Sequence, residues 1–228
     1  MEFCDPTIVP REHCSFCREL GCPPEQSRYF HVLAGKPERK LLLRTAHFVV
    51  IPGIGQLVPG YLLIRPTEHF ISCGHMPAPL FDELEELKLE LRSLLRSVYG
   101  TPTLFFEHGA LTERMRGSCC TDHAHVHVMP TDLDITAEVV NALAARRVEG
   151  FQALPELIQN ATPYVAFENA EGHVYAGNAT GAPKQLVRRI IARRLGREDW
   201  DWKAFVDEAG FITEAAVRET VDRLAVTV

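Results

Sequence analysis

The sequence predicts an α+β protein, and three observations lead to this prediction. Short runs of apolar, β-branched and aromatic residues, separated by turn residues, occupy the first third of the chain. The stretch 80–98 then repeats its apolar residues at helical spacing and is charged elsewhere. Two further strand-like runs, 103–108 and 123–129, follow this helix. The order of strands, long helix and strands indicates an α+β meander in which the helix packs through one apolar stripe.

The elements before the helix are predicted from local composition. Residues 1–27 contain four prolines and are expected to be irregular. The segment "PGIGQLVPG" is rich in glycine and proline and therefore predicts a turn between two strands. The strands predicted in this region are 29–33, 41–43, 48–51 and 61–64.

After about residue 134 the predicted elements are mainly helices. A helix is predicted over 136–148, and a hairpin over 163–177 that turns near Glu171 and Gly172. A second helix, 183–196, has proline near its start and glycine at its end, as helices often do. The stretches 200–209 and 213–226 are also predicted to be helical. We therefore expect a first domain, 1–134, and a mixed, mainly helical extension, 135–228, that packs on it.

Composition narrows the class of protein. The 228 residues are 46% hydrophobic, which is enough for a core, and the net charge of −6 gives no basic field for nucleic acid. No apolar run reaches the roughly 18 residues of a membrane span, and the N-terminus lacks the apolar region of a signal peptide. A cytoplasmic protein without a membrane partner is expected. The chain has seven cysteines, an odd number, and is expected to be cytosolic. Both facts argue against a disulfide framework and favour metal binding.

The stretch "CTDHAHVHVMP" carries the strongest chemical signal. His123, His125 and His127 are separated by single residues, and alternate residues of a strand share one face. Their rings are then expected in a row, about 6.6 Å apart along the backbone. Such a row indicates a metal site or a proton-handling site, whereas three solvated histidines are the alternative.

A second signal is the pair Cys14 and Cys17 in "HCSFC". Two thiolates at this spacing can bind one Zn²⁺, and two further nitrogen or sulfur ligands would complete a tetrahedron. A buried pair of reduced cysteines is the alternative. The candidates for the remaining ligands are Cys22, His69, Cys73, His123 and the adjacent Cys119 and Cys120.

Residues 12–131 resemble the histidine-triad (HIT) superfamily. "HAHVHVMP" is similar to its signature, and "CSFC", "LVPGYLLIRPTEHF", the long helix and "FFEHG" occur in the order expected of it. The resemblance implies a HIT-like antiparallel sheet and an enzyme that transfers or hydrolyses nucleotides at an α-phosphate. Its substrate would be a small nucleotide compound such as a dinucleoside polyphosphate, a nucleoside phosphoramidate or a nucleotide sugar. It also implies a homodimer, with the extension as an alternative to the partner subunit.

The resemblance also implies roles for single residues. His125 would be the nucleophile that forms a covalent nucleotidyl-imidazole, and His127 would donate to phosphate oxygens or to the leaving group. A structural zinc ion would be held by Cys14, Cys17, His69 and His123, and it would fix one end of the histidine strand.

The chain departs from the family at several positions expected to contact substrate. Ser118 and Cys119 precede the triad, where the family often has glycine and glutamine that hold phosphate. Gly53 replaces an aspartate that binds ribose in the phosphoramidase branch, and Tyr61 replaces a histidine. Glu107 stands where an asparagine is usual. We expect Glu107, Ser118 and Cys119 to contact a substrate that differs from the usual ones.

The helix predicted at 183–196 is a further candidate, since helix N-termini attract phosphate. Lys184, Gln185 and Arg188 would reach a distal phosphate if this helix covers the site, and a solvated basic helix is the alternative. Trp200 and Trp202 are expected to pack in the core rather than to stack against a nucleotide base.

Two other functions remain open on the sequence. One is an enzyme that uses all three histidines to bind a catalytic metal, but the first and last would lie about 13 Å apart on a straight strand. The other is a non-catalytic nucleotide-binding protein, in which the central histidine would have no role.

Overall fold

The structure is a computed structural model that describes residues 13–113 and 122–225. Its described part contains eight strands and six α-helices, so the predicted α+β class is confirmed. The helices are α1 (Ser15–Gly21), α2 (Pro79–Tyr99), α3 (Thr136–Leu143), α4 (Leu154–Gln159), α5 (Leu186–Arg194) and α6 (Ala215–Ala225). The strands are β1 (Leu43–Arg44), β2 (Phe48–Pro52), β3 (Leu62–Pro66), β4 (Thr103–Gly109), β5 (Val126–Pro130), β6 (Arg146–Val148), β7 (Tyr164–Glu168) and β8 (Val174–Asn178).

All eight strands form one antiparallel sheet in the order β1-β2-β3-β5-β4-β7-β8-β6. β5 lies between β3 and β4, with His127 opposite Leu63 on one side and opposite Phe106 on the other. The extension supplies the last three strands of the order, and β7 pairs directly with β4. Residues on both sides of position 134 therefore share a single sheet.

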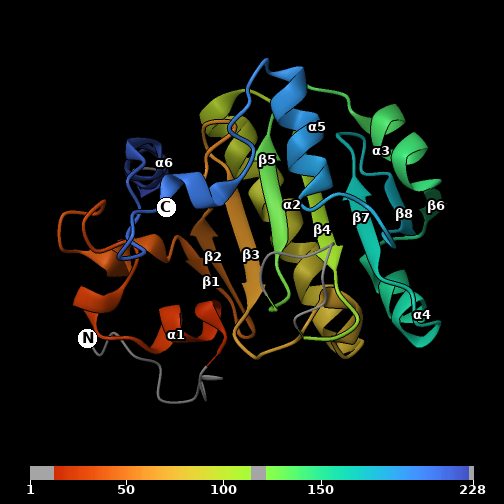
Figure 1. Cartoon of the computed structure of the whole chain (residues 1–228), viewed down its shortest axis with the longest axis horizontal. Helices are drawn as coiled ribbons and strands as arrows, with labels where there is room; N and C mark the ends of the chain where they lie inside the picture. Colours follow the sequence, from red (N-terminus) through yellow and green to blue (C-terminus); the bar gives the residue numbers. More distant parts are fainter. Residues whose placement is uncertain (1–12, 114–121, 226–228) are drawn as a thin grey trace.

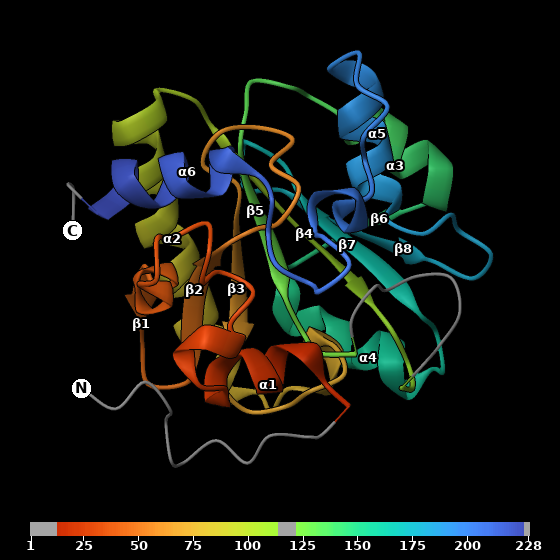
Figure 2. The ribbon, with the colours of Figure 1, turned by 60° about the vertical axis from the view of Figure 1, so that its left-hand side comes forward.

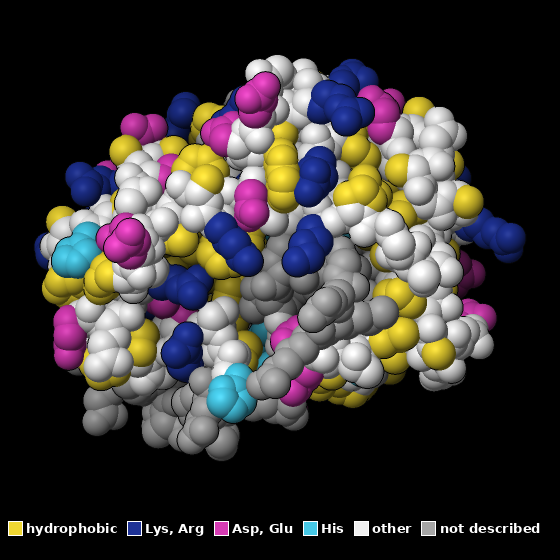
Figure 3. All heavy atoms as spheres, viewed as in Figure 1, with side chains coloured by type: hydrophobic (Ala, Val, Ile, Leu, Met, Phe, Trp, Pro, Cys, Tyr) yellow, Lys and Arg dark blue, Asp and Glu magenta, His cyan; other side chains and the backbone are white. Residues whose placement is uncertain are grey.

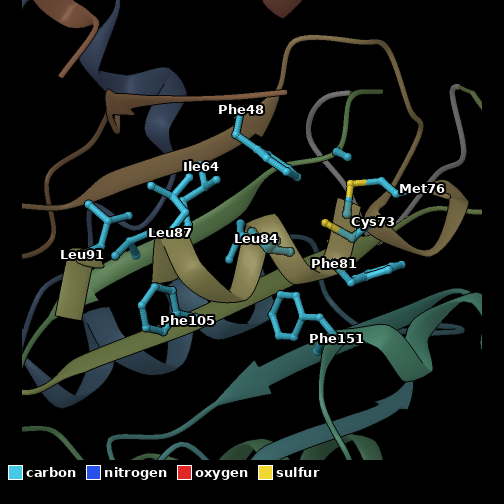
Figure 4. Close-up of a cluster of buried hydrophobic side chains, with 14 of the residues drawn as sticks. Phe48, Ile64, Cys73, Met76, Phe81, Leu84, Leu87, Leu91, Phe105 and Phe151 are labelled. Atoms are coloured by element: carbon cyan, nitrogen blue, oxygen red, sulfur yellow. The ribbon is translucent and has the colours of Figure 1, made fainter. Parts of the chain in front are cut away.

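One face of the sheet packs against α2, as the apolar stripe in 80–98 predicts. Leu84, Leu87, Leu91 and Leu95 on this helix are fully buried. They belong to a cluster to which the strands contribute Phe48, Ile64 and Phe105, labelled in Figure 4, and also Val126 and Val128. Gly100 ends the helix in the left-handed region, with φ of 74°, where glycine carries no steric penalty.

The other face of the sheet carries the functional segments. Figure 1 shows α5 in front of the sheet and α2 behind it. A second apolar cluster joins α3 and α5 to this front face, through residues such as Val139, Val187 and Ile191. Figure 2 shows α1 near the start of β5, also on this face. The sheet is thus covered on both sides, which allows the strand that carries His127 to be buried on both faces.

Several predicted elements differ from the structure, and α1 lies within residues 1–27, which were expected to be irregular. The predicted strand 29–33 forms turns, and its apolar residues pack on α6 in a separate cluster instead of pairing with a strand. The predicted helix 136–148 ends at Leu143, because Ala144 adopts φ of 47°, and the chain continues as β6. The stretch 200–209 contains only a 3₁₀ turn, Trp202–Phe205.

The described residues include no helix that has both the length and the apolar character to cross a membrane.

Candidate functional site

The histidine segment runs into the middle of the sheet. Only His127 lies within β5, so the predicted strand 123–129 begins three residues later than expected. His123 and His125 occupy the approach to the strand, and all three histidines are buried, with exposures of 0%, 6% and 7%. The intervening Ala124 and Val126 belong to the core cluster under α2. The alternative of three solvated histidines is therefore wrong.

His123 meets the three other residues predicted to bind metal. Its Nδ1 lies 3.4 Å from Sγ of Cys14 and 3.5 Å from Sγ of Cys17, and Nδ1 of His69 lies 3.3 Å from Sγ of Cys17. The four ligand atoms all lie within 4.8 Å of one another, although the residues come from α1, from the loop after β3 and from the approach to β5. The structure thus brings together four residues that could hold a metal ion.

The geometry of this cluster fits a tetrahedral site. With Zn–S bonds near 2.3 Å and Zn–N bonds of 2.0–2.1 Å, sulfur and nitrogen ligands lie about 3.5 Å apart, as the pairs above do. Nε2 of His123 lies 3.0 Å from the carbonyl oxygen of Pro66. Because a carbonyl can only accept, Nε2 carries the proton and Nδ1 is left free to bind metal. The residues present therefore fit a structural zinc ion.

His125 is held in one orientation and one tautomer. Its Nδ1 lies 2.7 Å from the carbonyl oxygen of His123, so Nδ1–H donates and Nε2 keeps its lone pair. The edge of the Phe16 ring packs against the imidazole, with centroids 5.3 Å apart. Burial lowers the pKa of His125 to about 4, so the ring is neutral at physiological pH. A neutral, oriented imidazole with a free Nε2 is a competent nucleophile.

His127 is enclosed by aromatic rings. It stacks between Tyr61, with centroids 5.9 Å apart, and Phe106, with centroids 4.3 Å apart. The hydroxyl of Tyr61 lies 2.6 Å from Nδ1 of His127. Burial lowers the pKa of His127 well below its usual value. When the Tyr61 hydroxyl donates to Nδ1 of the neutral ring, Nε2 carries the proton and can donate it to a substrate oxygen.

Tyr61 also occupies the space beside Gly53. A side chain at Gly53 would meet the Tyr61 ring, since a Cβ atom there would lie 2.3 Å from a ring carbon. The tyrosine and the glycine therefore belong together, because the larger ring needs the space that a side chain at position 53 would fill.

His108 links α5 to the histidines. Its Nε2 accepts a hydrogen bond of 3.5 Å from the backbone N–H of Val187, and its ring meets that of His127 edge-on. Burial lowers the pKa of His108 to about 3. A neutral histidine at the end of β4 thus lies between the start of α5 and the triad.

His125 and His127 line a cavity whose volume is about 570 Å³ when the solvent space at its opening is included. The remaining lining residues are Phe16, Arg28, Tyr29, Ile54, Tyr61, Leu63, His108, Gln185 and Trp202. The wall is thus largely aromatic and aliphatic, with a few polar groups.

A second, more polar hollow adjoins the first at Arg28. Arg28 lines both, and Arg18 and Ser15 are among the other residues of the second one. The buried carboxylate of Glu19, which also borders it, is paired with Lys40 at 2.7 Å. Figure 3 shows Lys and Arg side chains gathered over the middle of this face of the molecule.

The predicted substrate residues fall in different places. Gln185 lines the cavity, whereas Lys184 is exposed and is not among the lining residues. Arg188 is buried behind the wall, where its Nη2 and Nε donate to the carbonyls of Gly55 and Trp200. Its guanidinium lies 5.3 Å from the centre of the Tyr61 ring. Ser118 and Cys119 lie outside the described residues.

Glu107 points to the opposite face of the sheet. Its carboxylate accepts hydrogen bonds from the backbone N–H of Cys73 at 2.7 Å and from the hydroxyl of Tyr164 at 2.6 Å. Its neighbours Phe106 and His108 face the histidines instead. Burial raises the pKa of Glu107 to about 7. The structure does not bring Glu107 together with the cavity residues.

Sequence reasoning missed Arg28 and Tyr29 and assigned Trp202 to the core. Trp202 is only half-buried and lines the cavity, with the Arg28 guanidinium 5.7 Å from its ring centre. No local pattern identifies these residues, because Arg28 and Trp202 come from segments more than 170 positions apart in the sequence.

A scan against protein-family models and a search of curated protein sequences found no match to this chain.

Proposed function

We propose that this chain is a HIT-type nucleotide hydrolase or nucleotidyltransferase that acts at an α-phosphate through a covalent intermediate on His125. The observation that carries the proposal is the hydrogen bond from Nδ1–H of His125 to the carbonyl of His123. It leaves Nε2 unprotonated on a residue that lines the cavity. It also stabilises the positive charge that the imidazole gains when Nε2 becomes bonded to phosphorus.

The first step forms the bond from Nε2 of His125 to the α-phosphorus. In a dinucleoside polyphosphate or a nucleotide sugar, the bond from phosphorus to the leaving oxygen breaks and its electron pair departs with the leaving phosphate, which carries the charge. In a nucleoside phosphoramidate the P–N bond breaks instead, and the leaving amine takes up a proton from solvent. Nε2–H of His127 donates to a non-bridging oxygen as its charge rises, and the Tyr61 hydroxyl holds this donor in place.

The second step attacks phosphorus with an oxygen of water or of another acceptor. The P–N bond breaks, its electron pair returns to Nε2 of His125, and the acceptor loses its proton to solvent. A hydrolase and a transferase share this chemistry and differ only in the acceptor.

Zinc in the cluster of Cys14, Cys17, His69 and His123 would serve as a cross-link in this proposal. When bound, it would hold together α1, the loop after β3 and the start of the histidine segment. The chain's own residues then position the nucleophile, since the carbonyl that orients His125 belongs to His123. Phe16, between the two cysteines, packs against His125 from the same helix.

The contacts of the three histidines argue against the alternative of a single catalytic metal. Nδ1 of His123 faces the two cysteines, that of His125 faces a backbone carbonyl and that of His127 faces Tyr61. Nε2 of His123 donates to the carbonyl of Pro66, so neither ring nitrogen of His123 is available to share one metal ion with His125 and His127.

The two adjoining hollows support a substrate with two parts. The aromatic cavity suits a base and ribose, and the second hollow, with Arg18 and Arg28, suits a negatively charged remainder. Dinucleoside polyphosphates and nucleotide sugars have this composition.

The test is to trap the intermediate. The protein is mixed with dinucleoside polyphosphates, nucleoside phosphoramidates and nucleotide sugars, quenched at high pH, and analysed by intact mass and peptide mapping. We expect an acid-labile nucleotidyl adduct on His125, with turnover abolished in His125→Ala. An adduct on another residue, or an active His125→Ala protein with normal zinc content, would overturn the proposal.

A further inference from the structure

Gln185 has an unusual position in the cavity wall. It directly precedes α5 with φ of 54°, in the left-handed region that few side chains adopt. Its side chain is 4% exposed and lines the same cavity as His125 and His127. A buried polar side chain in a strained backbone position usually has a specific partner.

One end of the Gln185 amide has such a partner. Nε2 donates to Oδ1 of Asp201 at 3.0 Å, and the same oxygen accepts from the backbone N–H of Lys203 at 3.1 Å. A carboxylate can only accept, so it must face the NH₂ end of the amide. The orientation of the Gln185 side chain is thereby determined by chemistry.

The other end of the amide is an acceptor with no partner. Oε1 of Gln185 is shielded from solvent and makes no hydrogen bond to any residue in the described part of the chain. Arg188, on the same helix, donates from Nη2 and Nε to the carbonyls of Gly55 and Trp200. An unpaired buried carbonyl lowers stability, and an occupant of the cavity with a donor would satisfy it.

We propose that Gln185 selects the substrate by accepting a hydrogen bond from an N–H or O–H group of its nucleoside part. This inference rests on the proposed nucleotide chemistry and names one feature that the substrate must have. Phosphate is excluded as the partner of Oε1, because two acceptors repel. The role differs from the contact with a distal phosphate that the sequence suggested for Gln185. The donor is a ribose hydroxyl or an N–H group of the base.

The test is equilibrium binding of mononucleotides to the full-length, zinc-loaded protein by calorimetry. The four ribonucleoside 5′-monophosphates are titrated first. The tightest is then compared with analogues that lack the 2′-hydroxyl, the 3′-hydroxyl or the N–H donors of the base. Gln185→Met keeps the length of the side chain and removes both the Oε1 acceptor and the Nε2 donor to Asp201. Gln159→Met, at the exposed end of α4, is the matched control.

We expect Gln185→Met to weaken binding of the parent nucleotide about tenfold, a typical effect of leaving a buried polar group unpaired. One analogue should lose the same factor on the wild-type protein and nothing more on the variant, which identifies the donor. Asp201→Asn, which no longer requires the NH₂ end of Gln185, should reduce this discrimination as well. Gln159→Met should behave as wild type.

Two other results have different meanings. Equal affinities for all analogues on the wild-type protein, or equal losses for all of them in Gln185→Met, would overturn the inference about Gln185 alone. Absence of binding of every mononucleotide to the wild-type protein would overturn the nucleotide function and this inference with it.

Discussion

The hydroxyl of Tyr61 lies 2.6 Å from Nδ1 of His127, and the planes of the two rings are only 3° apart. The tyrosine directly precedes β3 and the histidine belongs to β5, and these two strands are neighbours in the sheet. Arg188 covers the tyrosine ring, and Gly53 leaves room for it. Tyr61, positioned by Arg188 and Gly53, therefore determines the tautomer of His127 through Nδ1, and so determines whether Nε2 carries a proton.

Tyr61→Phe should lower kcat about tenfold and change KM little. The ring stack is kept, but Nδ1 of His127 loses its donor and the ring is free to adopt the other tautomer, in which Nε2 cannot donate. Steady-state kinetics measures the effect, and NMR of the histidine ring nitrogens reports the tautomer. An unchanged tautomer together with unchanged kcat would show that Tyr61 does not position His127.

Cys14→Ser and Cys17→Ser should each bind less than half an equivalent of zinc and melt at lower temperature than the wild type. The thiolate is lost from a buried cluster that ties α1 to the sheet, and a structural metal contributes to folding. Cys22→Ser is the matched control, because Cys22 is half-buried just after α1 and is outside the cluster. Metal analysis and thermal unfolding check both effects. Full zinc content in Cys14→Ser would contradict the assigned ligand set.

Glu107→Gln should stabilise the protein increasingly as pH rises from 5 to 8. Burial raises the pKa of Glu107 from 4.5 to about 7, so the folded state holds this proton more tightly than the unfolded state does. The stability from this group is fully present below pH 4.5 and is lost as pH rises through about 7, by an amount on the order of 3 kcal/mol. Glutamine is neutral throughout.

The measurement is denaturant unfolding of both proteins at several pH values. Glu90→Gln, on an exposed position of α2, controls for the change in net charge. A difference between Glu107→Gln and wild type that stays constant from pH 5 to 8 would show that Glu107 is ionised over the whole range.

A chain truncated near residue 134 should fail to fold stably. The cut removes β7, which pairs with β4 from Phe105 to Gly109, and it removes α5 from the front face of the sheet. An unpaired edge beside buried residues such as Phe106 favours aggregation. Circular dichroism and size-exclusion chromatography check this. A folded fragment with full kcat/KM would show that the extension contributes nothing to the site.

The sequence predicted those parts of the site that depend on local pattern. The period of two in the histidine segment and the spacing of Cys14 and Cys17 are visible in short windows, and the resemblance to the HIT superfamily selected His69 and His123 from the candidate ligands. The long helix followed from its apolar stripe. The strand predicted at 29–33 was wrong, because β-type composition does not reveal whether a partner strand is available.

The errors in the site have a related cause. Glu107 and His108 are adjacent, and only the register of β4 against β5 decides which of them faces the cavity. Trp202 and Arg28 meet across more than 170 positions, a contact that no local pattern reports. The orientation of the Gln185 side chain depends on its hydrogen bond to Asp201, which lies near it because the chain folds back after α5.

His127→Ala should reduce kcat by a factor on the order of 10²–10³, the usual effect of removing one donor to a developing oxyanion. The loss is smaller than for His125→Ala, since the nucleophile and its bond to the carbonyl of His123 remain. The nucleotidyl adduct should therefore still form on His125, only more slowly, in a rapid-quench experiment. His47→Ala removes an exposed histidine that pairs with Glu83 at 2.6 Å, and it should leave kcat unchanged. A His127→Ala protein that forms no adduct at all, while its zinc content and melting temperature match the wild type, would make His127 as essential as His125. A His127→Ala protein with full kcat would show that His127 takes no part in the chemistry. The donor to the phosphate would then have to be another group in the cavity wall, such as Arg28.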